Sequence, residues 1–206
     1  MSKKQNIQSS STSTSSGFAA TIFEYMEMFV FAAATVILFM TFVLRLCVVS
    51  GPSMNNTLLN GERLLVSDLF YTPKQGDIIV FHQTSEIDDR FNEPIVKRVI
   101  ATQGQFVRID YTTATVYVSD DDTFTEDEAL DESQYAYFSN GKWSSPYGHT
   151  VSEVYEVPEG HLFVLGDNRN VSADSRDARV GFVDERRVLG KVLLRVTPFS
   201  KFGKVG

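Results

Sequence analysis

Residues 28–44 read MFVFAAATVILFMTFVL, a run that contains no charged side chain. As an α-helix with a rise of about 1.5 Å per residue, the run spans about 26 Å, close to the roughly 30 Å hydrocarbon thickness of a bilayer. A core helix of a globular domain seldom continues so far without a polar face. The run therefore predicts a transmembrane anchor over residues 28–46, followed by a separate domain over residues 47–206.

This anchor is predicted to remain in the mature chain. Its apolar run is longer than the core of a cleaved signal peptide, which has about 7–15 residues, and residues 49–51 (VSG) form a poor cleavage site. Cys47 suggests a lipoprotein as an alternative. However, Leu46 is bulky where a lipoprotein cleavage site requires a small residue.

The charges that flank the run predict its orientation. Lys3, Lys4 and the terminal amine precede it, and only Arg45 follows it closely. Because lysine and arginine are enriched on the cytoplasmic side, we expect a single-pass protein of the cell membrane with its N-terminus in the cytoplasm and its domain outside. Residues 1–27 are then a cytoplasmic tail, largely disordered because residues 9–16 (SSSTSTSS) are of low complexity.

The composition of the chain argues against several classes of function. Its net charge of −7 is unlike the basic surface that nucleic-acid binding requires. One cysteine cannot form an intramolecular disulfide, and the three scattered histidines give no zinc-ligand spacing. We therefore expect no metal, no cofactor and no nucleic-acid partner. The acidic residues 120–132 are expected to form a solvated loop.

The domain after the anchor consists of short runs rich in Val, Ile and Phe that glycine, asparagine and aspartate separate. No sustained helical periodicity follows the anchor, and residues 108–119 (RIDYTTATVYVS) read as a hairpin. The pattern predicts a mostly β fold, a compact sandwich or irregular barrel behind one transmembrane helix. The expected strands are residues 64–67, 77–81, 95–101, 106–110, 115–118, 162–165 and 191–196.

A possible nucleophile lies directly after the anchor, in Gly51-Pro52-Ser53-Met54. A serine on such a turn can present its hydroxyl openly, with backbone N–H groups nearby for an oxyanion. Ordinary turn chemistry explains the same residues. None of the three histidines has the accompanying residues of a Ser-His-Asp triad, so a serine nucleophile here requires another base, for which a desolvated lysine is suited.

Residues 95–100 (IVKRVI) supply a candidate for that base. Alternate residues of a strand share a face, so Lys97 and Arg98 each lie between two aliphatic neighbours. Arginine stays protonated and requires a carboxylate partner, whereas a lysine buried among aliphatic side chains can lose its proton. Two solvated cations on an edge strand are the alternative.

The third polar segment is residues 166–176 (GDNRNVSADSR), which follows the apolar residues 162–165. Two aspartates and two arginines in so short a loop indicate a fixed hydrogen-bond network, although a surface turn accounts for them as well.

Taken together, these segments resemble the type I signal peptidases, and the compact Gram-positive members in particular. The matching motifs are GPSMNNTL (51–58), GDIIVF (76–81), KRVIA (97–101) and GHLFVLGDNRNVSADSR (160–176), in the family's order behind an N-terminal anchor. The resemblance extends from the anchor to about Val196. It implies a membrane-bound serine endopeptidase that removes signal peptides from exported preproteins and needs no cofactor.

The resemblance also implies a role for each matching residue. Ser53 would be the nucleophile and Lys97 the general base, while Ser172 would hydrogen-bond the lysine amine and orient it. The oxyanion hole would use the backbone N–H of Ser53, with Gly51 standing where some members have a serine. The expected supporting ion pairs are Asp174 with Arg176 and Asp167 with Arg98.

Substrates of this family carry small residues at positions −1 and −3 of the cleavage site, which shallow apolar pockets favour. The residues expected to line these pockets are Val49, Gly51, Met54, Leu58, Ile95 and Val96. Ordinary core packing is an equal alternative for Leu58 and Ile95. Asn56 and residues 102–105 depart from the family pattern without touching the reacting groups.

Two other functions are compatible with parts of this sequence. A self-cleaving repressor-type Ser/Lys peptidase shares the chemistry, but the anchor and the lack of a DNA-binding segment disfavour it. A signal-peptidase-like assembly or chaperone factor without proteolytic activity is the second. Because Ser53 and Lys97 are both present, we favour the enzyme.

Overall fold

The computed structural model describes residues 14–83, 93–144, 148 and 152–205, and the chain divides into two compact units, residues 1–42 and 43–206. In the first unit, helix α1 (Thr14–Val43) has 30 residues and a length of about 45 Å. Residues 20–41 of this helix are long and apolar enough to cross a membrane.

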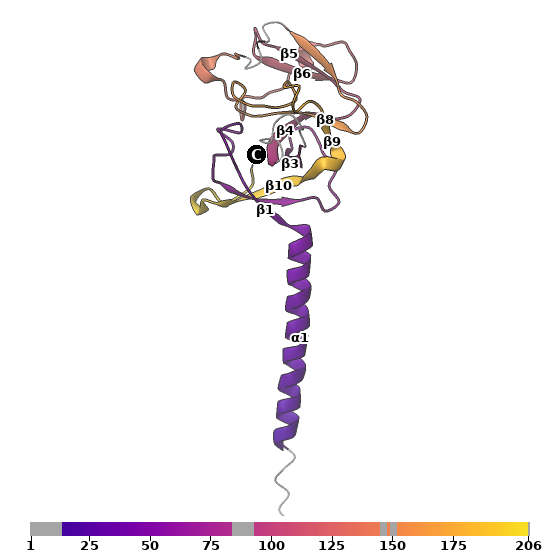
Figure 1. Cartoon of the computed structure of the whole chain (residues 1–206), viewed down its shortest axis with the longest axis vertical. Coiled ribbons are helices and arrows are strands. Elements are labelled where there is room, and N and C mark those ends of the chain that lie inside the picture. The colour runs from indigo at the N-terminus through magenta and orange to yellow at the C-terminus, as the bar shows by residue number, and fades with distance from the viewer. Residues whose placement is uncertain (1–13, 84–92, 145–147, 149–151, 206) are drawn as a thin grey trace, which may run out of the picture. The chain divides into compact units, whose positions relative to one another are not determined.

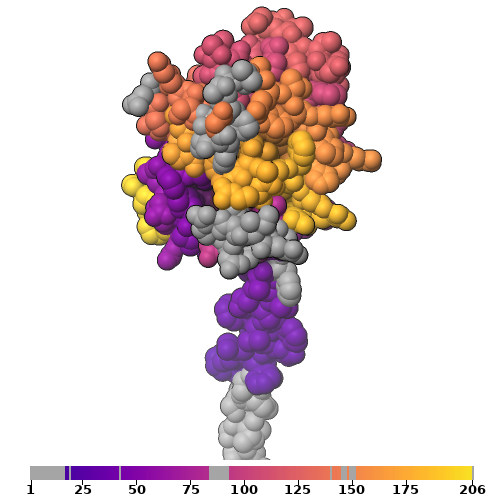
Figure 2. All heavy atoms as spheres, turned by 45° about the horizontal axis from the view of Figure 1, so that its top comes forward, coloured from indigo at the N-terminus to yellow at the C-terminus, as the bar shows by residue number. Residues whose placement is uncertain are grey.

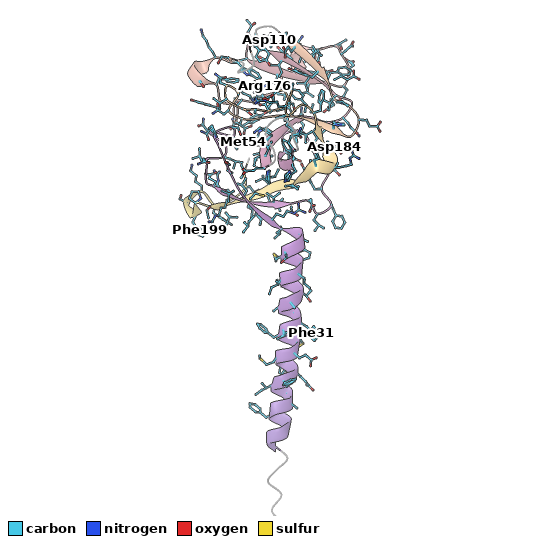
Figure 3. All side chains as sticks on the ribbon, in the orientation of Figure 1. Phe31, Met54, Asp110, Arg176, Asp184 and Phe199 are labelled. Atoms are coloured by element: carbon cyan, nitrogen blue, oxygen red, sulfur yellow. The ribbon has the colours of Figure 1, made fainter. Side chains whose placement is uncertain are left out.

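Most of the described side chains of α1 are exposed; Phe31, which projects outward in Figure 3, is 65% exposed. Threonine hydroxyls within the helix donate hydrogen bonds to backbone carbonyls one turn earlier, as the Thr35 hydroxyl does to the Phe31 carbonyl at 2.8 Å. Internal satisfaction of polar groups is what a lipid environment requires. The helix begins well before residue 28 and ends at Val43, because residues 45–48 pair as a strand instead of continuing it.

The second unit contains two antiparallel sheets (Figure 1). The larger has seven strands in the order β1-β2-β10-β3-β4-β8-β9, and the smaller has three in the order β6-β5-β7. The strands are β1 (Arg45–Val48), β2 (Arg63–Ser67), β3 (Ile78–His82), β4 (Pro94–Ala101), β5 (Phe106–Asp110), β6 (Thr115–Ser119), β7 (Glu153–Glu156), β8 (His161–Leu165), β9 (Val183–Asp184) and β10 (Val188–Thr197). The prediction of a mostly β domain behind an N-terminal apolar helix is confirmed.

Every strand expected from the sequence is present, and β5 pairs with β6 as the expected hairpin. Three further strands, β1, β7 and β9, were not expected. Strand β1 follows the helix without a break signal, β7 (EVYE) alternates with charged residues, and β9 has only two residues. Neither β7 nor β9 has the apolar run that marks the other strands, and the apolar residues of β1 come directly after the apolar run of the helix.

The two faces of β3 supply two different parts of the core. Ile78 and Val80 pack in a cluster with Val49, Met54 and other residues near the serine turn. Ile79 and Phe81, the alternate residues of β3, pack in a second cluster with Val99 and with Leu162 and Val164 of β8. Alternation along a strand explains this division. Strand β3 therefore sits in the middle of the core, and its neighbour β4 carries Lys97.

A third cluster joins the two sheets. Ile100 of β4 and Phe163 of β8 pack against Val107 and Ile109 of β5, and Trp143 completes this cluster. Within the second unit, β5 and β6 lie at one end and β1 and β10 at the other (Figure 1). The space-filling view shows the same division, with residues near 115 at one end of the unit and yellow C-terminal residues away from it (Figure 2).

Candidate active site

Ser53 lies on a tight turn between β1 and β2. The turn is closed by hydrogen bonds from Asn55 N to the Pro52 carbonyl at 3.1 Å and from Leu58 N to the Met54 carbonyl at 2.8 Å. Met54 and Leu58 are buried, so their packing in the core holds the turn in place. Its first residue, Gly51, has a φ of 85°, a conformation that glycine adopts without strain.

The polar loop after β8 holds this turn from a distant part of the sequence. Asn168 donates its backbone N–H to the Ser53 carbonyl at 3.0 Å and its side-chain amide to the Pro52 carbonyl at 3.1 Å. Gly166, at the start of the loop, lies against the Ser53 carbonyl so closely that a Cβ there would be 2.6 Å from its oxygen. The loop therefore fixes the backbone on both sides of Ser53.

Lys97 of β4 reaches the serine hydroxyl. Its Nζ lies 2.8 Å from Ser53 Oγ and 3.0 Å from the Val96 carbonyl oxygen. The side chain is only 3% exposed. Burial lowers the pKa of the Lys97 amine from 10.5 to about 8, although the carboxylates of Asp174 and Asp167 act in the opposite direction. An amine with such a pKa is readily deprotonated and can accept a proton from a hydroxyl.

Two buried ion pairs surround the amine. Arg98 donates to both Asp167 oxygens, at 2.9 and 2.8 Å, and Arg176 donates to both Asp174 oxygens, at 2.7 and 2.8 Å. All four side chains are buried. In Figure 3, the label of Arg176 lies between those of Asp110 and Met54. Each arginine charge is thus compensated by a carboxylate, so Lys97 is the cation that can give up its proton.

A pocket of about 130 Å³ opens beside the Ser53 hydroxyl and the Lys97 amine. Among the residues expected to bind substrate, Val49, Met54, Ile95 and Val96 line it. Gly51 and Leu58 do not belong to this lining. Leu58 is fully buried in the core, which agrees with the alternative role of core packing given for it above. The remaining lining residues are Ser50, Glu93 and Pro94.

The signal peptidase family, peptidase S26, matches residues 22–197 of the chain. This chain belongs to that family. Signal peptidase IB of Staphylococcus aureus is 34% identical over 180 residues, which cover 83% of this chain and 88% of that protein. A probable signal peptidase I-1 of Synechocystis is 33% identical over 164 residues, 77% of this chain and 74% of that protein.

A crystal structure of a signal peptidase I from Enterococcus faecalis is 26% identical, covers 59% of this chain and 97% of its own chain, and has a TM-score of 0.40. Family membership confirms the predicted resemblance to the signal peptidases. It also confirms the expected enzyme class, a serine peptidase. An N-terminal apolar helix in a member of this family indicates a membrane-anchored protein.

The structure places Ser172, the third residue expected at a signal peptidase site, in the interior next to Gly166. Burial raises the pKa of the Asp174 carboxyl, but the charge and hydrogen bonds of Arg176 hold it below its ordinary value, with smaller contributions from the Gly166 N–H and the Ser172 hydroxyl. The hydrogen bonds of the Lys97 amine go to Ser53 and Val96. A direct role of Ser172 in orienting the amine therefore stays a prediction.

Several residues that stabilise this site were not identified from the sequence. Thr57 donates its hydroxyl to Asp167, and the ring of Tyr135 lies 3.9 Å from the Arg98 guanidinium carbon. Arg169 is fully buried and pairs with both oxygens of Glu132, at 2.7 and 2.6 Å. The expectation that residues 120–132 form a solvated loop is therefore wrong at Glu132, where a buried arginine provides a partner.

Sequence signals existed for only some of these residues. Asn168 and Arg169 belong to the motif that identified the polar loop, and Thr57 belongs to the serine motif, but their partners lie far away in the chain. In the part of the chain that the structure describes, no three His, Cys, Asp or Glu side chains form a group that would hold a metal ion.

Gly166→Ala is expected to impair this signal peptidase, because a Cβ would lie 2.1 Å from Ser172 Oγ and 2.6 Å from the Ser53 carbonyl oxygen. Overpacking of this kind costs about 1–3 kcal/mol. Since the groups that must move hold the nucleophile, we expect kcat/KM for preprotein cleavage to fall by at least about tenfold, together with a lower Tm.

The matched control for this substitution is Gly17→Ala on helix α1, where an added Cβ meets no atom within 4 Å. We expect this variant to retain activity and Tm. Unchanged activity of the Gly166→Ala variant would show that the loop does not hold Ser53 as closely as described.

Proposed function

We propose that this chain removes signal peptides from preproteins at the membrane, with Ser53 as the nucleophile and Lys97 as the general base. The observation that carries the proposal is the 2.8 Å approach of the buried Lys97 amine to the Ser53 hydroxyl. Asp167, Asp174, Arg98 and Arg176 support it as buried pairs that compensate one another.

The reaction proceeds in two halves. The neutral Lys97 amine accepts the Ser53 proton while the serine oxygen attacks the carbonyl carbon before the scissile bond. The tetrahedral intermediate collapses as the C–N bond breaks, and the Lys97 ammonium gives its proton to the leaving amine. Water then attacks the Ser53 ester with Lys97 again as base, which releases the signal peptide and restores the serine hydroxyl.

Stabilisation of the developing oxyanion falls to the backbone N–H of Ser53. Within the described residues, this N–H takes part in no hydrogen bond. Because Gly51 stands where some members carry a serine, no hydroxyl is supplied at that position. An oxyanion-hole donor in a serine protease contributes about 3–4 kcal/mol of transition-state stabilisation, so the remaining donor has a large effect.

The substrate backbone is proposed to add to the open part of β4. Strand β8 pairs with β4 only from Arg98 onward, so among the residues that the structure describes no strand pairs with Pro94 to Val96 on that side. An extended peptide that pairs with such an edge gains main-chain hydrogen bonds, and pockets for alternate side chains give specificity. The small pocket beside Ser53 supports a preference for small residues at positions −1 and −3.

The membrane topology is part of the proposal. The apolar part of α1, residues 20–41, would anchor the chain in the cell membrane, with the residues before it toward the cytoplasm and the domain from β1 onward, which carries the candidate site, outside. Lys3 and Lys4 support this orientation through the enrichment of cations on the cytoplasmic side.

The test is to incubate the detergent-solubilised full chain with a panel of preproteins and to map every cut by mass spectrometry. We expect one cut per preprotein, after a small residue that has another small residue two positions earlier. Binding without cleavage would instead favour the non-catalytic assembly or chaperone factor, and cuts without this residue preference would contradict the proposed pocket.

A further inference from the structure

One carboxylate lies at the pocket beside Ser53. The described residues that line this pocket are apolar, small or part of the reacting pair, apart from Glu93. Glu93 is exposed, and within the described residues it takes part in no ion pair. Neither the core nor the reaction explains a charged side chain at this position.

The position of Glu93 relative to Lys97 follows from strand geometry. Alternation along β4 places Lys97 and Ile95 on one face; Glu93 lies at a bend just before the strand begins at Pro94, and it lines the same pocket as these two residues. Four residues of extended chain span about 13 Å. A peptide paired with this edge rises by the same amount per residue, so Glu93 lies beside a substrate residue about four positions away from the one beside Lys97.

Two main-chain groups at this end of the edge contribute little to pairing with a peptide. Pro94 has no N–H and therefore cannot donate a ladder hydrogen bond to the peptide. The Val96 carbonyl already accepts a hydrogen bond from the Lys97 amine. Because backbone pairing is limited at this end of the edge, the side chain of Glu93 has more influence on which residue is tolerated there.

We propose that Glu93 selects substrates by charge at position −5, favouring lysine or arginine and disfavouring glutamate or aspartate. This inference rests on the proposed function, and it takes residue −1 to bind beside Lys97 with the upstream residues running along Ile95 toward Glu93. For charges about 6 Å apart in water, a unit change in substrate charge alters the rate by about threefold, so lysine and glutamate differ by about tenfold.

The experiment measures kcat/KM of the full chain in a non-ionic detergent on peptides that differ only at position −5, which is Lys, Gln or Glu. The wild-type order is expected to be Lys, then Gln, then Glu, and the differences should shrink at high salt because exposed charges are screened. Glu93→Gln is expected to equalise the three peptides, and Glu93→Lys to reverse their order.

The control is Glu126→Gln, which removes an exposed carboxylate of the 3-10 helix η2 (Glu126–Glu128), a segment that contributes no residue to this pocket. This variant should keep the wild-type order. An order that persists in Glu93→Gln, or one that appears only when residues after the cut are varied, would overturn the assignment. Equal cleavage of all peptides by the wild type would overturn this inference alone, whereas no cleavage of any peptide would overturn the proposed function with it.

Discussion

Ser53→Ala is expected to abolish preprotein cleavage, with kcat/KM lowered by at least about 10⁴-fold. The hydroxyl that Lys97 approaches at 2.8 Å would be absent, so no acyl-enzyme would form. The alanine side chain fits wherever serine does, so Tm should change little. The measurement is the initial rate of cleavage of one preprotein, followed by mass spectrometry of the products.

The matched control removes a hydroxyl elsewhere. Ser200 lies exposed in the 3-10 helix η5 (Phe199–Lys201), so Ser200→Ala should keep the wild-type rate. Full cleavage by the Ser53→Ala variant would rule out this serine as the nucleophile.

Lys97→Arg and Lys97→Met are both expected to lower kcat/KM by at least about 10³-fold, for different reasons. Arginine retains a positive charge but cannot be deprotonated in a protein, so it supplies no base. Methionine has nearly the same shape and supplies neither charge nor base. Cleavage rates of both variants on the same preprotein test this expectation, and an active arginine variant would contradict it.

The stability of the Lys97→Met variant separates chemistry from folding. Burying an ionisable amine is unfavourable, so its replacement by an apolar side chain should leave Tm unchanged or raised. Loss of activity without loss of Tm assigns the amine to catalysis. The control Lys201→Met changes an exposed lysine and should alter neither quantity.

The strands were predictable because their residues alternate or run apolar over short distances. The segment from Ile95 to Ala101 shows how far this reasoning extends. Alternation alone indicated that Lys97 and Arg98 lie on opposite faces between aliphatic neighbours, and the structure buries both. Which serine and which carboxylate they meet depends on pairings between segments more than 40 residues apart, which local pattern does not encode.

The family motifs predicted some of these long-range pairings. Resemblance to the signal peptidases associated Arg98 with Asp167 and Arg176 with Asp174, and the structure has both pairs. It gave no indication of the buried pair between Arg169 and Glu132, because Glu132 lies in a segment whose other acidic residues are mostly exposed. A run of like charges does not reveal which member has a buried partner.

The first and last residues of the N-terminal helix could not be predicted from the sequence either. Hydropathy identified the apolar run but not the residues before it, where serine and threonine suggested disorder and the helix begins at Thr14. After Val43 the chain turns into β1 because Cys47 and its neighbours pair with β2, a long-range interaction that hydropathy does not report.

The most direct test of Lys97 as the general base is an NMR titration of its amine in the detergent-solubilised full chain, with lysine labelled at the ε-carbon and the Lys97→Arg variant used for assignment. Lys97 is expected to titrate near pH 8, well below the ordinary lysine value of 10.5, and kcat/KM is expected to rise with pH through the same value because the neutral amine is the active form. A Lys97 amine that titrates together with the other lysines would contradict this role.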